Sequence, residues 1–154
     1  MRWRALKTLH LGEVQERIAA YREKHVSLSL LHEEFTKGRM PPGRFQEYVD
    51  WTSMTHAVRA YQEGEDFEYL AEEDLSLTVE DFRKLTPRRL ELLDQLTEGR
   101  AGSINELAEH VGRDVKNVYR DLKALEGMGF VALNREGRSM VPELLVYEIT
   151  LILD

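Results

Sequence analysis

The sequence contains no cysteine, which excludes disulfide bonds and metal sites built from thiolates. It also has no apolar run that approaches the roughly 20 residues of a membrane-spanning helix. The N-terminus, Met1-Arg2-Trp3-Arg4, is basic, but mixed polar sequence follows it where a signal peptide has an apolar core. These absences predict a cytoplasmic protein with no membrane partner.

The common signatures of catalysis and metal binding are absent as well. The sequence has no Gly-rich phosphate loop, no HExxH motif and no distinctive spacing of carboxylates. His25 and His32 lie seven residues apart, but the expected helix cap at Ser27 would break a shared ligand face. We therefore expect no catalytic residue, no metal site and no cofactor, and we predict that the protein is not an enzyme.

The chain is long enough for one large domain or two small ones, and its composition is that of a globular protein. Of its 154 residues, 42% are hydrophobic and 32% are charged, which is too apolar for a disordered chain. The formal net charge is −7. Because binding to nucleic acid depends on neutralising phosphates, an acidic chain needs its cations gathered on one surface to bind there.

Three helix starts follow one another in the C-terminal third. Thr86-Pro87 combines an N-cap residue with a proline at the first helical position. Ser103 and Glu106 have the spacing of a capping box, and Gly112 is placed to end the helix that they begin. Asp114 can cap a third helix, which runs to the glycines at 127 and 129. A tight turn therefore separates the second and third helices.

A short hairpin is predicted after these helices. Phe130–Leu133 and Ser139–Val141 have the character of strands, residues 134–138 form a turn, and Pro142 is expected to end the pairing. Three helices and a hairpin in this order make a winged helix-turn-helix. The predicted fold class is mainly α with small β, a helical N-terminal region preceding the winged helix-turn-helix domain.

In this fold the third helix is the recognition helix, which enters the DNA major groove while the wing contacts the backbone or minor groove beside it. Lys116, Arg120 and Lys123 suit phosphates or guanine edges, and Asn117 suits adenine. Backbone N–H groups at Ser103 can bind a phosphate. The predicted double-stranded DNA contacts are Ser103, Arg113, Lys116, Asn117, Tyr119, Arg120, Lys123, Arg135 and Arg138.

Each of these residues also has an ordinary structural interpretation. A single cation on a helix is often only solvated, and the Tyr119 ring is expected to be largely buried with its hydroxyl in water. Four acidic residues dilute the basic surface, so one copy should bind DNA modestly. These are Asp114, Asp121, Glu126 and Glu136. A symmetric homodimer would double the contact area.

The N-terminal half is predicted to be helical. A short strand is expected at Thr8–Leu11, followed by helices over 13–24, from Ser27 to before Gly38, and over 44–62. The last of these helices has a stripe of large apolar residues, which is either a core or a surface for another chain. The stripe consists of Phe45, Tyr48, Trp51, Met54, Val58 and Tyr61.

The segments that flank the winged helix-turn-helix complete the expected organisation. Leu75–Leu77 is a candidate strand, and Thr78 caps a short helix to Leu85. The apolar run 146–153 should be a strand that pairs with Leu75–Leu77, with Thr8–Leu11 or with a second copy of itself. We predict a helical N-terminal domain over 1–77, for dimerisation or partner binding, and a winged helix-turn-helix DNA-binding domain with a C-terminal strand over 78–154.

Three family resemblances extend this interpretation. The segments Glu106–Gly112, Val118–Glu126 and Gly129–Val131 resemble MarR/ArsR-type winged helix-turn-helix transcriptional regulators. The segments 7–12, 74–82 and 85–90 resemble small prokaryotic MarR-like DNA-binding proteins. Residues 26–51 are similar to a helical segment of antitoxin-sized proteins.

The resemblances imply a sequence-specific regulator, in the form of a dimeric repressor of its own operon. The alternative is an antitoxin or protein-interaction module, in which the N-terminal half neutralises a partner toxin and the winged helix is secondary. A small-molecule effector is also compatible with MarR-like proteins, although nothing in the sequence marks its pocket.

Overall fold

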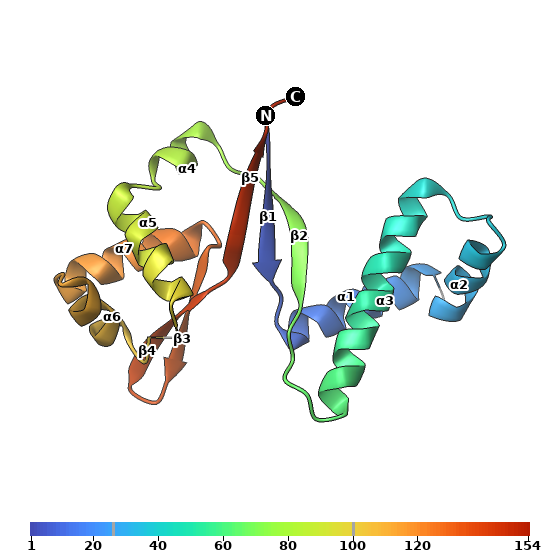
Figure 1. Ribbon diagram of the computed structural model, residues 1–154, viewed down its shortest axis with the longest axis horizontal. Helices are drawn as coiled ribbons and strands as arrows, with labels where there is room; N and C mark the ends of the chain where they lie inside the picture. The colour runs from blue at the N-terminus through green and yellow to red at the C-terminus, as the bar shows by residue number, and fades with distance from the viewer. Residues whose placement is uncertain (26, 100) are drawn as a thin grey trace. The chain divides into compact units, whose positions relative to one another are not determined.

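The computed structural model describes residues 1–25, 27–99 and 101–154, which form two compact units (Figure 1). The large unit contains Met1–Lys7 and Ala71–Asp154, and the helical unit contains Thr8–Leu70. The strands on either side of residues 8–70 therefore belong with the C-terminal part of the chain. The division expected at residues 77 and 78 assigned them to the N-terminal half.

The large unit has the predicted winged helix-turn-helix architecture. Its three helices are α5 (Pro87–Thr97), α6 (Ile104–Val111) and α7 (Val115–Gly127). The hairpin of β3 (Val131–Glu136) and β4 (Ser139–Leu144) follows them as the wing. The fold class predicted from the sequence, mainly α with small β, is confirmed.

Local capping explains where these helices begin and end. The side chains of Thr86, Ser103 and Asp114 accept hydrogen bonds from backbone N–H groups in the first turns of α5, α6 and α7. Gly112 ends α6 in the left-handed region, at φ 66°, which glycine adopts without strain. The capping box at Ser103 is incomplete, because the Glu106 carboxylate accepts instead from the Gly102 N–H at 2.6 Å.

The wing is longer than predicted. Pro142 lies opposite Leu133, and the pairing continues to Val131 opposite Leu144. The prediction that Pro142 ends the hairpin was wrong, because in a two-stranded ribbon a residue without an N–H can face the open side.

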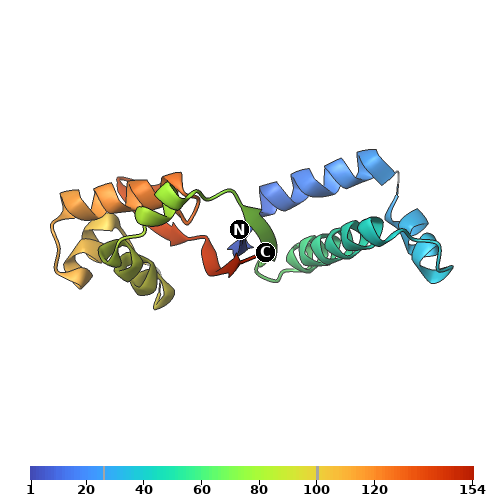
Figure 2. The same cartoon turned by 90° about the horizontal axis from the view of Figure 1, so that it is seen from above.

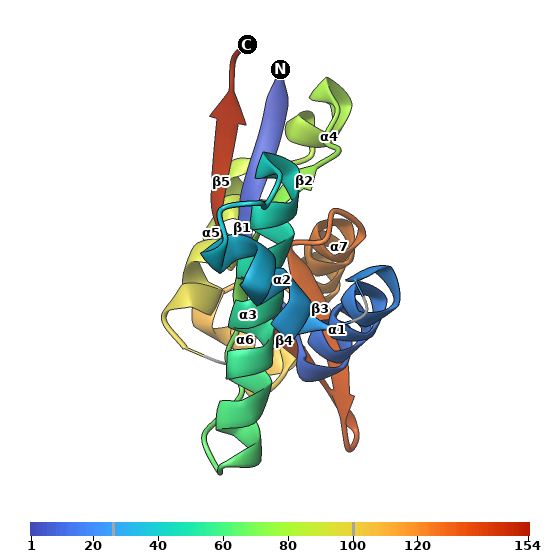
Figure 3. The ribbon, with the colours of Figure 1, turned by 90° about the vertical axis from the view of Figure 1, so that its right-hand side faces the viewer.

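A three-stranded sheet, in the order β2-β1-β5, completes the large unit (Figure 3). Its strands are β1 (Arg2–Thr8), β2 (Leu70–Leu75) and β5 (Val146–Ile152). The strands predicted at Thr8–Leu11 and Leu75–Leu77 were each displaced from the observed ones. β5 pairs antiparallel with β1, with Trp3 opposite Leu151, whereas pairing with Thr8–Leu11, with Leu75–Leu77 or with a second copy of itself had been expected.

The short helix α4 (Val79–Arg83) crosses from the sheet to α5 and has a complete capping box at Thr78 and Asp81. Phe82 stacks on Trp3 with ring centroids 5.3 Å apart. The capping hydrogen bonds from Thr78 and Lys84 hold the pKa of the exposed Asp81 carboxyl at about 2. The prediction of a Thr78-capped helix is confirmed.

One continuous core holds the large unit together. Residues from α5, α6, α7 and both sets of strands meet in it, so the recognition helix and the wing are fixed to the same interior. The most deeply buried members are Ala5, Leu92, Leu107, Ala108, Val118, Leu122, Leu125, Phe130 and Val131.

The helical unit contains α1 (Leu11–His25), α2 (Leu28–Thr36) and α3 (Pro42–Gln62), with α1 and α3 packed against each other (Figure 2). Ser27 caps α2 as predicted; Val26, which begins the antitoxin-like segment, lies outside the described residues. The middle of the α3 stripe is core, since Trp51 is only 2% exposed and stacks on Tyr21. The ends of the stripe, Phe45 and Tyr61, are exposed.

The two histidines considered as a metal pair have different partners. His25 contacts the Glu47 carboxylate, and His32 lies 2.7 Å from the hydroxyl of Tyr48. Within the described residues, no three His, Asp or Glu side chains are grouped to hold a metal ion. No described helix combines the length and apolarity needed to cross a membrane.

Candidate nucleic-acid interface

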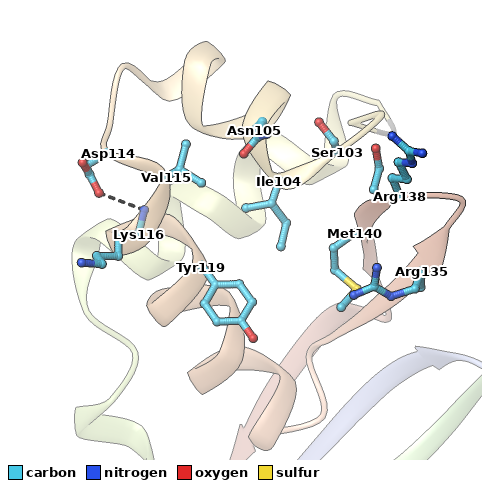
Figure 4. A pocket seen from close by; sticks show the side chains of 11 residues that line it. Ser103, Ile104, Asn105, Asp114, Val115, Lys116, Tyr119, Arg135, Arg138 and Met140 are labelled. Atoms are coloured by element: carbon cyan, nitrogen blue, oxygen red, sulfur yellow. Dashed lines mark hydrogen bonds between the residues drawn. The ribbon is translucent and has the colours of Figure 1, made fainter.

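A groove of about 820 Å³ lies between the start of α6, one face of α7 and the wing (Figure 4). It brings together segments that are separated in sequence by the core helices and by the hairpin. The residues that line it are Ser103, Ile104, Asn105, Asp114, Val115, Lys116, Tyr119, Arg135, Arg138, Ser139 and Met140.

Helix caps and glycine turns position α6, α7 and the wing around the groove. The Ser103 hydroxyl accepts from the Glu106 N–H at 3.1 Å, which leaves other N–H groups of the first α6 turn available at the groove wall. Gly112 allows the tight reversal from α6 to α7, and Gly137, at φ 62°, allows the wing to turn. Asp114 accepts from the Lys116 N–H at 2.8 Å, so its carboxylate is occupied in capping α7.

Three cations face this groove from two parts of the chain. Lys116 comes from the first turn of α7, and Arg135 and Arg138 come from the two sides of the wing turn. Among the described residues, none of the three side chains has an ion-pair partner, and all three are exposed or partly exposed. The groove therefore holds three cations against one carboxylate, that of Asp114, and its excess positive charge is open to solvent.

Tyr119 also lies in the groove, but not as expected. Its side chain is 44% exposed, so the prediction of a largely buried ring was wrong. The ring stands on the surface of α7 because the core face of the helix is already filled by Val118 and Leu122. Together with Val115, it gives the groove floor an apolar strip beside the cations.

A second, smaller basic pocket of about 190 Å³ lies on another side of α7. Asn117 and Arg120 from α7 line it together with Arg88 from α5. Arg88 and Arg120 are exposed and have no ion-pair partner within the part of the chain that the structure describes. Cations therefore flank the recognition helix on two sides.

Arg113 is buried in an ion-pair network and is not a free cation at the surface. Its guanidinium contacts Asp121, whose other carboxylate oxygen accepts from Arg89 Nε at 3.0 Å. The Arg113 side chain is only 11% exposed. Burial raises the pKa of the Asp121 carboxyl, but the hydrogen bonds and charges of Arg113 and Arg89 outweigh it and lower the pKa overall.

Lys123 is separated from both basic pockets. It lies beside Ser76, Lys84 and Met128, and its ammonium donates to the Glu126 carboxylate at 2.7 Å. That hydrogen bond and the negative charge of Glu126 raise the pKa of Lys123.

The nine predicted contacts thus divide into three sets. Ser103, Lys116, Tyr119, Arg135 and Arg138 line the main groove, Arg113, Asn117 and Arg120 line the smaller pocket, and Lys123 lines neither.

Sequence reasoning missed Asn105 in the groove and Arg88 and Arg89 in the smaller pocket. A signal for the arginines was present. They follow Thr86-Pro87 at the start of α5, where the helix dipole disfavours positive charge. Two cations in that position indicate an anionic partner, and for Arg89 this partner is Asp121.

Comparison with known proteins gives local similarities to the large unit. A protein-family model described as HVO_A0114 matches residues 84–151, which is less than half of the chain. None of the curated proteins matches the chain. The matched family region contains α5, α6, α7, the wing and most of β5.

Two solved structures from Mycobacterium bovis are similar over part of the chain. One is the homodimeric winged helix-turn-helix DNA-binding domain of Mb0332, a possible ArsR-family transcriptional regulator, at 28% identity over 42% of this chain and 59% of that one, with TM-score 0.39. The other is a possible transcriptional regulatory protein, at 23% identity over 45% and 78%, with TM-score 0.38. At these TM-scores, the function proposed below rests on the geometry of the groove.

Proposed function

We propose that this protein is a transcriptional regulator that binds double-stranded DNA with α7 in the major groove and the wing beside it. The observation that carries the proposal is the convergence of Lys116, Arg135 and Arg138 on one groove without acidic partners among the described residues. Phosphate contacts supply most of the affinity of such an interface, and free cations on adjacent elements are what such contacts need.

The dimensions of α7 suit this role. Its 13 residues make a helix of about 20 Å, and a helix about 10–12 Å across fits a major groove about 12 Å wide. A helix in that groove has one phosphate backbone on each side. Lys116 and the wing arginines would meet one backbone, and Arg88 would meet the other.

The acidic total charge is compatible with this interface because the nearby carboxylates are engaged. Asp121 is held by two arginines, Asp114 caps α7, and Glu126 pairs with Lys123. Their negative charge is therefore partly offset where it lies, while the groove cations stay free. We expect modest affinity from one copy, strongly weakened by salt.

We further propose that the functional form is a homodimer that represses its own operon. Two recognition helices would read half-sites about 34 Å apart, one helical turn along the DNA. Doubling the contacts compensates for the small number of free cations on each copy. The base contacts fall to Asn117 and Arg120, which suit adenine and guanine edges respectively.

Fluorescence anisotropy with DNA from the region upstream of the gene, against scrambled DNA at two salt concentrations, tests the proposal. We expect tighter binding to the upstream DNA and loss of affinity at the higher salt concentration. Arg120→Ala should cost about 1–3 kcal/mol on the preferred sequence if the side chain reads a base. Arg138→Ala should weaken binding to both DNAs and reduce the salt dependence.

Arg83→Ala is the matched control, because it removes an exposed α4 cation that pairs with Glu80 and lines neither basic pocket. It should leave the affinity unchanged. Equal losses for Arg83→Ala and Arg138→Ala would show a general charge effect and contradict the proposed interface. No binding to either DNA at low salt would also contradict it.

A second candidate function is recognition of a protein partner, such as a cognate toxin, by the helical unit. The observation that favours it is an aromatic cluster in which the exposed Phe35 stacks on the exposed Phe45 and on the partly buried Tyr48, at 5.7 and 5.4 Å. Exposed aromatic groups of this kind are enriched at protein interfaces. In this function Phe35→Ala would abolish partner binding and leave DNA binding intact, whereas Arg120→Ala would do the reverse.

A further inference from the structure

We infer that β5 is the dimerisation strand, and that it pairs antiparallel with β5 of a second copy across a two-fold axis at Ile149. This inference rests on the proposed function for its purpose, because it names the subunit interface of the proposed dimeric regulator.

The two edges of the sheet differ in charge. Strand order places β2 and β5 at the edges. β2 reads Leu-Ala-Glu-Glu-Asp-Leu, and its three consecutive carboxylates protect that edge from pairing with another strand. β5 reads Val-Tyr-Glu-Ile-Thr-Leu-Ile, with one charge, no proline and no lysine. Only the β5 edge is therefore left suited to a further strand.

The apolar face of the sheet continues onto β5 but loses its cover there. Opposite residues in an antiparallel pair share a face, so Ile149 lies beside the buried Ala5 and Leu151 lies beside the buried Trp3. Ile149 and Leu151 nevertheless remain 37% and 43% exposed. Tyr147, which lies at the irregularity where the β1–β5 register shifts, is also exposed. A strand added at this edge would extend the face and bury these side chains.

A hollow next to β5 can receive side chains from such a strand. It has a volume of about 290 Å³ and lies between β5 and α5, where Leu90 and Leu93 form part of its wall. Leu90 is exposed, although it lies on the apolar side of α5. The hollow is lined by Leu90, Leu93, Asp94, Thr97, Phe130, Leu144, Val146, Tyr147, Glu148 and Ile149.

A second copy of β5 is complementary to this edge. A two-fold axis at Ile149 places Glu148 opposite Thr150 and Tyr147 opposite Leu151, and the irregularity that β5 makes with β1 lies at Tyr147, away from the axis. The single charge of each strand therefore faces a hydroxyl and not another carboxylate. Near the axis, Ile149 therefore meets Ile149 of the second copy, and Leu151 meets Tyr147, so apolar side chains face apolar side chains.

The same pairing limits assembly to two copies. The resulting six-stranded sheet would have an acidic β2 at each end, and such edges resist further strands. A two-fold contact also uses the same surface on both subunits, so it closes. We therefore expect a dimer and no larger species.

Thr150→Glu tests the register directly, with Thr150→Gln as the control of equal size. In the dimer the introduced carboxylate lies opposite Glu148 of the second copy, twice per interface. Within one copy Thr150 lies opposite Arg4, which accommodates a carboxylate, so the fold is preserved. Light scattering after size exclusion over a concentration series should give a dissociation constant on the order of tenfold higher for Thr150→Glu.

The double variant Glu148→Lys with Thr150→Glu restores opposite charges across the axis and should recover the dimer. High salt should reduce the difference between Thr150→Glu and Thr150→Gln. A wild-type chain that is still monomeric at about 100 µM would overturn the inference. Equal dissociation constants for the two Thr150 variants would overturn it as well.

DNA binding is measured on the same samples, which separates this inference from the proposed function. Charge-dependent dimerisation without DNA binding would contradict the proposed function and support the β5 interface. Sequence-specific DNA binding by a monomer would support the DNA-binding function and overturn the β5 interface.

Discussion

At the scale of single residues, Asp121 determines which cations are available at the surface. Its carboxylate holds Arg89 from α5 and Arg113 from the turn before α7, so it ties the recognition helix to the rest of the domain. The Nε and Nη1 atoms of Arg113 are buried without a hydrogen-bond partner among the described residues. Asp121 therefore supplies the hydrogen bonding that this buried guanidinium has.

Asp121→Asn should destabilise the large unit by about 2–4 kcal/mol at pH 7, because it leaves buried guanidinium groups without a counter-charge. Urea unfolding of the wild type and of Asp121→Asn, each in a Trp51→Phe background so that Trp3 is the tryptophan that reports, measures the loss. Glu91→Gln, an exposed carboxylate change on α5, is the control and should have little effect. A loss as small as that of the control would show that the network contributes nothing to stability.

The same network predicts a pH dependence. The pKa of Asp121 is lower in the folded state, so its stabilisation is complete above the ordinary carboxyl pKa of about 4 and is lost as pH falls through the folded value. Acidification from pH 7 to pH 3 should therefore reduce the stability difference between wild type and Asp121→Asn. A difference that stays constant over this range would contradict the assignment.

Free and buried cations could not be separated from the sequence. Arg113 and Arg138 both adjoin predicted turns, yet one is locked by Asp121 and the other faces the groove. What distinguishes them is a tertiary contact that brings Asp121 and Arg89 together from positions 32 residues apart. The sequence predicted which elements carry the site, and packing decided which side chains are presented.

At the scale of elements, the helices and the C-terminal strand β5 were predictable, and the other strands of the sheet and their pairing were not. Caps such as Thr86, Ser103 and Asp114 act within a few residues, so the helix starts could be located from local sequence. The buried Trp3 and Ala5 of β1 are stabilised by β5 and by Phe82, which are distant in sequence. β2 was missed because its carboxylates obscure the alternation expected of a strand.

A cavity made in α3 should destabilise the helical unit and leave the stability of the large unit unchanged. Trp51→Ala removes the largest buried side chain of the helical unit and should cost about 3–5 kcal/mol there. That loss is comparable with the stability of a small domain, so the helical unit should unfold at room temperature. Circular dichroism should show lost helix, while the thermal transition reported by Trp3, the remaining tryptophan, should be unchanged.

Val49→Ala is the control on the same helix, because Val49 is exposed and its truncation leaves no cavity. It should keep the helical signal of the wild type. A single transition in which Trp3 fluorescence and helix content are lost together in Trp51→Ala would show that the two units unfold as one.

At the scale of the whole molecule, the helical unit is an insertion between two neighbouring strands. β1 ends at Thr8, β2 begins at Leu70, and these strands are adjacent in the sheet. The Leu9 N–H donates to the Tyr69 carbonyl at 3.0 Å, so the chain leaves and re-enters the helical unit at one place. Domains inserted in this way have their ends close together and can be removed without stretching the host.

Replacing residues 8–70 with a short Gly-Ser linker should therefore leave a folded large unit. The core, both basic pockets and the β5 edge all lie within the retained residues, so the shortened chain should bind the same DNA and form the same dimer. Its thermal transition, anisotropy titration and light-scattering mass measure these three properties. Because the linker closes a gap between adjacent strands, we expect only a small change in stability.

The shortened chain also decides which unit holds the subunits together. A shortened chain that binds DNA but is monomeric would place the dimer contact on the helical unit, where the aromatic cluster of Phe35, Phe45 and Tyr48 is the available surface. Retention of the dimer, together with its sensitivity to Thr150→Glu, would leave that cluster free for a different protein. The helical unit would then connect DNA binding to a partner, since the chain enters that unit from β1, the strand that pairs with β5.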